Sequence, residues 1–316
     1  MTIDLARAAA FVTAHARLLD RRRFARLFGF PGTRDPAPAD SAAGVLQALE
    51  GHRNPDGGYG WGLEPDLRDA SSQPGAALHA FEAFADAAPA TSPRAAELCD
   101  WLAGAAVPGT GGALPFALPV ASDVGVAPFW AGADPTAPSL HITTAVLMPA
   151  HLVARHDPAV AAHPWLAGAT RWALDTLTSQ DEPGHTLELR FALNLLDVVA
   201  QGNAEAAGVL DRWAAHVPAD GTRHVEGGKE DEMMRPLDFS PWPDAPMRAR
   251  IEPGAVAADL DRLAAGQQDD GGWDVDFLAY SPAASLEWRG YATVMALQTL
   301  RHNGRLDSRG PGGTDR

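Results

Sequence analysis

Two short groups of acidic and basic residues, far apart in the chain, have the composition of an acid–base site. The first contains Glu64, Asp66 and Arg68, and the second contains Glu287 and Arg289. Two carboxylates that share a site of low dielectric can raise the pKa of one of them, which suits a general acid. The alternative is structural: Glu64 would pair with Arg289, or Glu287 with Arg68, to fasten two parts of the fold. Both hypotheses require the two groups to meet in space.

Four other polar positions could carry chemistry. Asp274 and Asp276 stand two residues apart, so in an extended segment their carboxylates share a face and could act as an acid or as metal ligands. Helix capping is the alternative, because Asp favours turns. His141 begins a predicted helix, where a neutral imidazole could act as a base, and His79 offers a second one; a capping or core histidine is the alternative for both. The candidate catalytic residues are Glu64, Asp66, Asp276, Glu287 and His141.

Tryptophans could line a ligand site, because their ring faces stabilise cations. Trp130 and Trp242 lie in segments without helical periodicity and are the best candidates for ligand contact, with Trp288 beside Glu287 as a third. Trp61 and Trp273 belong to a repeated turn and are expected to pack. The candidate ligand-binding residues are Arg68, Trp130, Trp242, Trp288 and Arg289.

The repeated turn could bring the two charged groups together. Residues 54–61 read Asn-Pro-Asp-Gly-Gly-Tyr-Gly-Trp and residues 267–274 read Gln-Gln-Asp-Asp-Gly-Gly-Trp-Asp, so Asp56 and Asp270 are equivalent, 214 residues apart (270 − 56). Paired glycines allow a sharp turn with φ > 0, the Asp can bond free helix ends, and the aromatic ring can cover them. The pattern predicts structural fasteners formed by Asp56, Gly57, Gly58, Tyr59 and Trp61 in the first turn and by Gln268, Asp270, Gly271, Gly272 and Trp273 in the second.

Helical periodicity dominates the rest of the chain, which predicts an all-α fold. The predicted helices cover residues 3–27, 43–49, 74–84, 93–103, 140–153, 165–177, 187–200, 204–216, 253–265 and 284–301, and no alternation predicts strands. We expect one domain over residues 1–303. Two long segments near 107–138 and 217–250 lack helical periodicity and could be lids or binding loops, and residues 304–316 are expected to be a disordered tail.

Residues 268–273 (Gln-Asp-Asp-Gly-Gly-Trp) resemble the Gln-Trp repeat of squalene–hopene and oxidosqualene cyclases, and residues 54–60 resemble the glycine-rich repeat of protein prenyltransferase β subunits. From residue 4 to 301 the chain is similar to prenyltransferase and squalene-cyclase repeat proteins. The resemblance implies a single-domain α/α toroid, with inner and outer helix rings around a central cavity. It also implies acid chemistry on an isoprenoid or another apolar small molecule. Pectate lyases and complement thioester domains use related barrels, so the repeat specifies the fold better than the reaction.

The chain departs from the catalytic motifs of these families. The nearest match to the cyclase Asp-x-Asp-Asp motif is Asp274-Val275-Asp276-Phe277, which lacks the last acid. No Asp-Asp-x-x-Asp is present for magnesium, and Cys99 has Glu97 where the prenyltransferase zinc site has Asp. We therefore predict no cofactor, and a divalent metal has no motif to support it. Two alternatives stay open: a non-catalytic toroid that binds a small ligand or a protein partner, and a saccharide- or uronate-active enzyme on the same barrel.

Composition limits the partners. The 316-residue chain carries 40 acidic and 25 basic residues, a formal net charge of −15 that repels nucleic acid and anionic membranes. Cys99 is the single cysteine, so an internal disulfide is impossible and a reducing compartment fits. The N-terminus does not read as a signal peptide, and no stretch is long and apolar enough to span a membrane. We expect a cytoplasmic protein without an integral membrane segment.

Overall fold

The computed structural model describes residues 3–30 and 38–306, and these residues are predominantly helical. In chain order the α-helices are α1 (Leu5–His15), α2 (Leu18–Phe28), α3 (Pro38–Glu50), α4 (Pro74–Asp86), α5 (Pro93–Ala105), α6 (Pro128–Ala131), α7 (Leu140–Ala154), α8 (Pro158–Ala161), α9 (Pro164–Ser179), α10 (Thr186–Val199), α11 (Ala204–Ala214), α12 (Pro236–Phe239), α13 (Pro253–Ala265) and α14 (Pro282–His302). The all-α class predicted from periodicity is confirmed. None of the described helices is long and apolar enough to cross a membrane.

The two segments without helical periodicity contain short elements. In the first, α6 forms a single turn before α7. In the second, β1 (Arg223–His224) pairs antiparallel with β2 (Met233–Met234), and the 3₁₀ helix η1 (Pro246–Arg250) follows α12. The sequence does not indicate these strands because a two-residue ladder is too short to produce an alternation. Residues 307–316 of the expected tail lie outside the described part of the chain.

Helix boundaries follow capping chemistry. Proline occupies the first turn of α4, α5, α9, α13 and α14, where its missing N–H costs no hydrogen bond. Ser92, Ser139 and Ser281 accept backbone hydrogen bonds at the starts of α5, α7 and α14. The segments that the periodicity predicts as helices therefore begin at residues that favour helix starts.

One predicted helix is two helices in the structure. The apolar period over residues 3–27 is interrupted at Arg17, between α1 and α2. Arg17 is extended (ψ 156°), and its guanidinium donates to Leu63 O (2.7 Å) and to Asp20 Oδ2 (2.9 Å). These contacts hold the corner without a glycine or proline, so the local sequence gives no signal for it.

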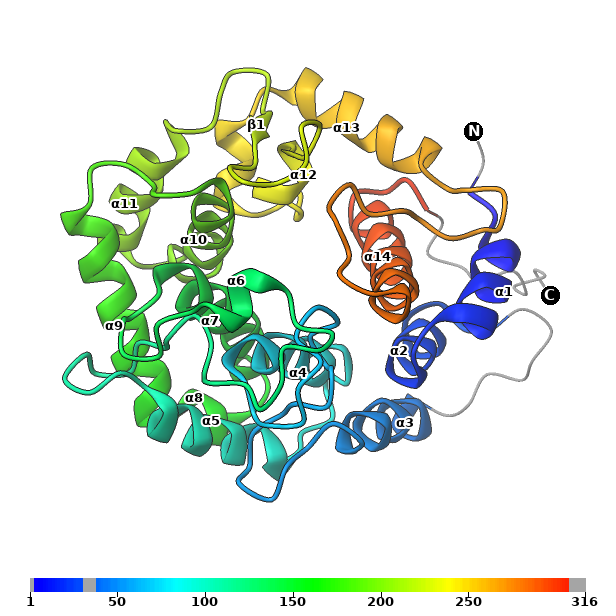
Figure 1. The fold of residues 1–316 in the computed structure, drawn as a ribbon. Helices are drawn as coiled ribbons and strands as arrows, with labels where there is room; N and C mark the ends of the chain where they lie inside the picture. The colour runs from blue at the N-terminus through cyan, green and yellow to red at the C-terminus, as the bar shows by residue number, and fades with distance from the viewer. Residues whose placement is uncertain (1–2, 31–37, 307–316) are drawn as a thin grey trace.

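The helices form an inner and an outer set. Figure 1 shows α2, α4, α7, α10, α12 and α14 inside, with α1, α3, α5, α9, α11 and α13 around them. In the inner set α7 packs against α4 and α10, α10 contacts α12, and α14 contacts α2. In the outer set α5 contacts α9, and α9 contacts α11. Because α14 also contacts α1, the first and last helices lie side by side.

In both repeated turns a glycine N–H donates a hydrogen bond to the side chain of the preceding Asp. In the first, Gly58 N donates to Asp56 Oδ1 over 3.0 Å, and in the second Gly272 N donates to Asp270 Oδ1 over 3.0 Å. Each Asp therefore bonds the backbone of its own turn. The structural role of the two turns stays a prediction, which these hydrogen bonds favour.

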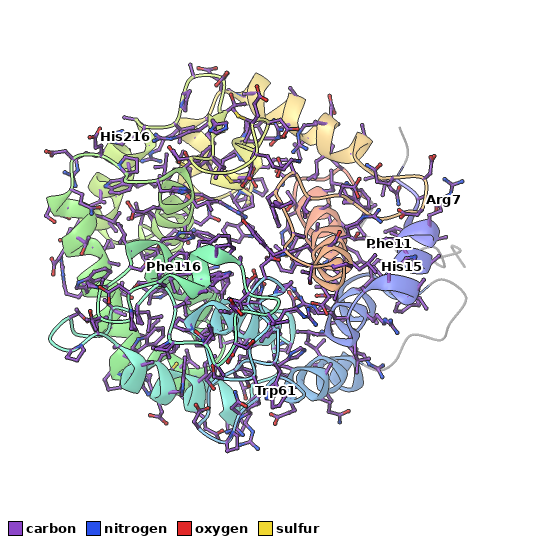
Figure 2. The ribbon with its side chains drawn as sticks, viewed as in Figure 1. Arg7, Phe11, His15, Trp61, Phe116 and His216 are labelled. Atoms are coloured by element: carbon purple, nitrogen blue, oxygen red, sulfur yellow. The ribbon has the colours of Figure 1, made fainter. Side chains whose placement is uncertain are left out.

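The same turns pack against different helices. Gly57 and Gly271 have φ of 94° and 95°, a conformation that favours glycine. A Cβ on Gly57 would lie 3.2 Å from Glu97 O of α5, whereas a Cβ on Gly271 would lie 2.3 Å from the Arg7 carbonyl oxygen of α1. Figure 2 shows Arg7 and Phe11 on α1. Since α5 follows α4 in the chain, α1 occupies the position of a helix that would follow α14.

The aromatic residues of the turns differ in burial. Tyr59 and Trp273 are buried, as the packing role predicts. Trp61, expected to pack as well, is 58% exposed. Its backbone adopts φ 54°, and its indole Nε1 donates to Asn54 Oδ1 over 2.8 Å. The packing prediction is therefore wrong for Trp61; Tyr59 is the buried aromatic residue of the first turn, at the position that Trp273 occupies in the second.

Candidate functional site

The two charged groups of the sequence meet where inner helices begin. Arg68 Nη1 lies 2.5 Å from Glu287 Oε2, so one of the two expected ion pairs is present. Tyr280 N, in the segment before α14, donates to Asp66 Oδ1 over 2.8 Å. The segment before α4 is thus bonded directly to the segment before α14 and to α14 itself.

Beside this contact lies a group of polar and aromatic side chains that links α4 to α14, and we call it the seam cluster. Its members are Glu64, Asp66, His79, Glu82, Trp288 and Tyr291. Glu64, Asp66 and His79 are no more than 5% exposed. Charged groups in such surroundings are stable only when they are paired and hydrogen-bonded.

His79 lies between two carboxylates at the centre of the seam cluster. Its Nε2 is 3.0 Å from Glu64 Oε2, and its Nδ1 is 3.1 Å from Glu82 Oε2. Tyr291 OH donates to Glu82 Oε1 over 2.7 Å, and Arg23 Nη1 of α2 lies 3.9 Å from Glu82 Oε2. The network therefore joins α2, α4 and α14.

The charges of this network stabilise one another. Burial alone would lower the pKa of His79, but its hydrogen bonds with Glu64 and Glu82 and the charges of these residues raise it to about 9. Burial would raise the pKa of Glu82, but the His79 hydrogen bond and the charges of His79 and Arg23 outweigh it and lower that pKa. His79 is therefore an imidazolium between carboxylates at neutral pH, which is a structural arrangement rather than a free base.

Asp66 is the carboxyl group that remains suited to acid chemistry. Its Oδ2 accepts from Trp288 Nε1 over 2.7 Å, and its Oδ1 accepts from Tyr280 N. Burial raises the pKa of Asp66, while these two hydrogen bonds and the charge of Arg68 oppose the rise. A raised pKa favours the protonated form that a general acid requires.

Two charged candidate residues, Arg289 and Asp276, form their ion pairs away from the seam cluster. Arg289 Nη1 is 2.8 Å from Asp270 Oδ2, within the second turn repeat, so the alternative pairing of Arg289 with Glu64 is wrong. Asp276 Oδ2 lies 3.8 Å from Arg235 Nη2 and forms no hydrogen bond or ion pair with a described seam residue. The two charged groups of the sequence therefore meet through Arg68 and Glu287, whereas Arg289 and Asp276 are bonded elsewhere.

An aromatic cluster adjoins the seam cluster. We define it as Phe116, Phe129, Trp130, His141, Phe191 and Tyr280. Phe116 stacks on Trp130 with ring centroids 4.6 Å apart, and Phe129 meets the edge of Tyr280 at 5.6 Å. Because the backbone N–H of Tyr280 bonds to Asp66, the aromatic cluster begins where the buried acid is held.

His141 belongs to the aromatic cluster. Its ring stacks on Phe191 at 5.1 Å and meets Phe116 at 5.4 Å. Burial, with the charges of His185 and Arg190, lowers the pKa of His141 to about 3. The imidazole is therefore neutral at physiological pH, as the sequence hypothesis of a base requires, but its neighbours are mainly aromatic rings.

The three tryptophans expected to bind a ligand lie in three places. Trp130 is in the aromatic cluster and Trp288 is in the seam cluster. Trp242 lines a cavity formed by the C-terminal ends of inner helices, away from both clusters. A single site built from all three is therefore not present.

Several members of the site could not be named from motifs. Glu82, Tyr291 and Phe191 carry no motif, although His79 and Glu82 are spaced i,i+3 and so share a helix face.

Among residues 3–30 and 38–306, no group of three or more His, Cys, Asp and Glu side chains is placed to hold a metal ion.

Comparisons with known proteins do not indicate a family or a function for this chain. No protein-family model matches the chain, and no curated protein is significantly similar to it.

Proposed function

We propose that the chain is an α/α toroid that binds an apolar small molecule at the end where the inner helices begin, and that Asp66 is the acid that acts on it. The buried, hydrogen-bonded Asp66 beside the aromatic cluster is the observation that carries the proposal. The resemblance of the repeated turns to squalene-cyclase and prenyltransferase repeats points to an isoprenoid or a similar hydrocarbon.

The equivalence of the two turns supports the toroid. The first turn packs on α5, the outer helix that follows α4, and the second packs on α1 in the same manner. An open array would leave the last turn without such a partner, whereas in a closed ring the first outer helix supplies it. The inner and outer sets of helices in Figure 1 agree with this arrangement.

Exposed hydrophobic side chains support ligand binding at this end. Among the described residues, the large hydrophobic side chains that are exposed all begin an inner helix or lie in a segment leading into one: Leu18, Trp61, Val124, Phe129, Leu278, Tyr280 and Leu286. Two of them, Phe129 and Tyr280, are in contact, and exposed apolar groups that lie together are typical of a binding surface. An apolar molecule would find its contacts here beside the aromatic cluster.

Acid chemistry would use the proton of Asp66. Protonated Asp66 would transfer its proton to a carbon–carbon double bond, which leaves a carboxylate on the enzyme and a carbocation on the substrate. The N–H groups of Trp288 and Tyr280 already point at the two carboxylate oxygens and would stabilise the charge that forms. The faces of nearby rings would stabilise the cation.

Uncharged isoprenoids test the proposal. Farnesol, geranylgeraniol and squalene would be incubated with the protein, and bound and converted material would be measured by gas chromatography and mass spectrometry. We expect binding that falls about tenfold in a Phe129→Ala, Tyr280→Ala double variant, and cyclic or hydrated products. A Trp172→Ala variant on outer helix α9 is the matched control. Absence of binding by all three molecules would overturn the proposal.

A non-catalytic ligand-binding protein is the second candidate, and the pairing of charges favours it. Glu64, Glu287 and Asp276 each lie within ion-pair distance of a basic side chain, and both oxygens of Asp66 accept hydrogen bonds. The same pairing removes the two free carboxylates on which the saccharide alternative depends. Recovery of bound isoprenoid with no product would select the non-catalytic candidate.

A further inference from the structure

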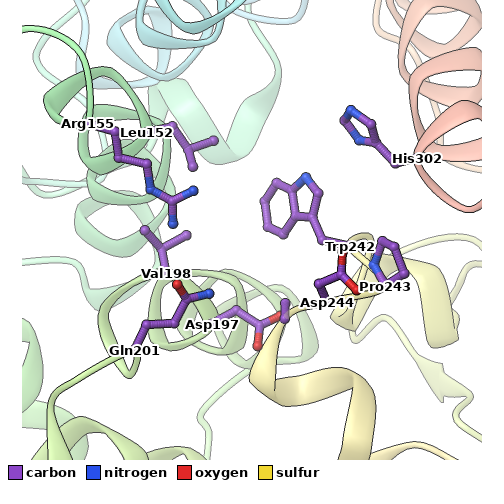
Figure 3. Close-up of a pocket in the computed structure, with 10 residues that line it drawn as sticks. Leu152, Arg155, Asp197, Val198, Gln201, Trp242, Pro243, Asp244 and His302 are labelled. Atoms are coloured by element: carbon purple, nitrogen blue, oxygen red, sulfur yellow. The ribbon is translucent and has the colours of Figure 1, made fainter.

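A cavity of about 280 Å³ lies at the opposite ends of the inner helices from the seam cluster. The C-terminal parts of α7, α10 and α14 contribute Arg155, Asp197 and His302, and the segment before η1 contributes Trp242 and Asp244 (Figure 3). The volume is just below the roughly 300–1,000 Å³ of typical small-molecule sites, so a small ligand would fill it.

Asp197 is a buried carboxyl group with one unused oxygen. It is 1% exposed, and its Oδ1 accepts from Met247 N over 2.5 Å. Its Oδ2 has no hydrogen-bond partner among the described residues. Burial raises the pKa of Asp197 to about 7, against the opposing effects of the Met247 hydrogen bond and of the charges of Arg250 and Arg248. Native proteins rarely leave a buried polar atom unsatisfied, so this one requires an explanation.

Two opposite charges at the same cavity form no close bond within the described part of the protein, although the charge of Asp244 also acts on Arg248. The side chains of Arg155 and Asp244 are exposed, and neither forms a hydrogen bond or an ion pair with a described residue, including each other. Figure 3 shows the Trp242 indole extending between Arg155 and His302. A cation, an anion and an aromatic face are therefore available to one ligand.

We infer that this cavity binds a small zwitterion that carries an ammonium group and a carboxylate on a short hydrocarbon body. The ligand carboxylate bonds to Arg155, a guanidinium suited to bidentate carboxylate binding. The ammonium group bonds to Asp244, and the negative charge of Asp197 behind it adds attraction. The hydrocarbon body and the ammonium group lie against the face of Trp242. This site is independent of the function proposed for the other end of the molecule.

Calorimetric titration at pH 8, where Asp197 is mostly ionised, tests the inference. The zwitterions L-leucine and 6-aminohexanoate are compared with the single-charge probes n-hexylammonium and hexanoate. We expect at least one zwitterion to bind with a Kd of about 1 mM or lower, and about tenfold more tightly than either single-charge probe. No binding by either zwitterion below 10 mM, or equal binding by a single-charge probe, would overturn the inference.

Variants test whether Arg155 binds the carboxylate of the ligand and Asp244 its ammonium group. We expect Arg155→Gln and Asp244→Asn each to weaken zwitterion binding about tenfold, and Arg155→Gln to leave n-hexylammonium binding unchanged. Glu230→Gln, at an exposed loop residue, removes the same charge as Asp244→Asn and should leave the Kd unaltered. If the Arg155 and Asp244 variants bind as the wild-type protein does, the assignment is wrong. Circular dichroism on each variant confirms that the fold is intact.

Discussion

Among the described residues, charged side chains are paired at one end of the inner helices and lack ion-pair partners around the cavity at the other. In the seam cluster His79 is bonded to Glu64 and Glu82, and the neighbouring Arg23 lies 2.6 Å from Asp86. At the cavity the charged side chains of Arg155 and Asp244 have no partner in the described structure, and Asp197 has one unused oxygen. Paired buried charges hold elements together, whereas the exposed charges of Arg155 and Asp244 are available to a ligand in the cavity, with Asp197 buried behind them.

This contrast changes where chemistry should be sought. The seam contains most of the residues whose types first indicate catalysis, but their partners are already inside the protein. What remains available at that end is the proton of Asp66 and the aromatic cluster. At the cavity end, the sequence singles out only Trp242, yet Arg155 and Asp244 also line the cavity and form no hydrogen bond or ion pair with a described residue.

Removal of His79 should produce the largest loss of stability. His79→Ala would leave Glu64 and Glu82 buried without their common cation, and breaking a buried ionic network typically costs about 3–5 kcal/mol. Urea unfolding would measure the change. His15→Ala, on the exposed side of α1, is the control and should change stability by less than about 1 kcal/mol. A similar small change in His79→Ala would show that the seam is not structural.

The turn that packs on α1 should tolerate substitution less well than its equivalent. Gly271→Ala forces a Cβ to 2.3 Å from the Arg7 carbonyl at a φ of 95°, so we expect a loss of about 3 kcal/mol. Gly57→Ala meets Glu97 O at 3.2 Å and should cost less. Gly254→Ala on α13 faces open space and is the control. Equal losses at Gly57 and Gly271, measured by thermal unfolding, would contradict the tight contact with α1.

The seam should also give stability a specific pH dependence. The pKa of His79 is raised to about 9 in the folded protein, above its unfolded value of roughly 6.5. The folded state therefore holds a proton that the unfolded state releases, so this stabilisation is complete below about pH 6.5 and is lost as pH rises through about 9. Unfolding free energies from pH 6 to 10 would show the decline. A His79→Gln variant should lack this component, and an unchanged profile would contradict it.

The cavity charges should contribute least to stability. Arg155→Gln and Asp244→Asn remove exposed groups without partners, so each should change the free energy of unfolding by less than about 0.5 kcal/mol in the absence of ligand. Chemical denaturation of both variants beside the wild-type protein would measure this. A loss near that of His79→Ala would mean that these charges have an internal role.

Sequence patterns predict much of the fold because helix periods and caps are local. The helices from α4 to α14 with more than one turn are recognised by apolar spacing, first-turn prolines and serine caps. The corner at Arg17 is not, because its hydrogen bond to Leu63 O comes from a distant segment. Local pattern therefore fails where tertiary contacts decide the backbone.

The site shows the same limit. Sequence reasoning offers Arg68–Glu287 and Glu64–Arg289 as equal alternatives, and the structure contains only the first. Glu64 instead pairs with His79, whose place in the fold depends on how α4 packs. Ion-pair partners far apart in the chain follow from packing, which residue types alone do not determine.

The cavity is the clearest omission of the sequence analysis. Asp197, Arg155 and Asp244 come from three separate segments and match no motif. Arg155 and Asp244 form no hydrogen bond or ion pair with a described residue, and one oxygen of Asp197 has no hydrogen-bond partner, a property that exists only in the folded structure.

Asp66→Asn, tested with farnesol, geranylgeraniol and squalene, examines the central claim most directly. Asn has almost the same shape as Asp and keeps one of the two oxygens that accept from Tyr280 N and Trp288 Nε1, but it carries no transferable carboxyl proton. Ligand binding should therefore persist while product formation falls at least a hundredfold, within the range of general acid catalysis. Retained ligand binding also shows that the variant is folded. Product formation at the wild-type rate in Asp66→Asn would contradict the account.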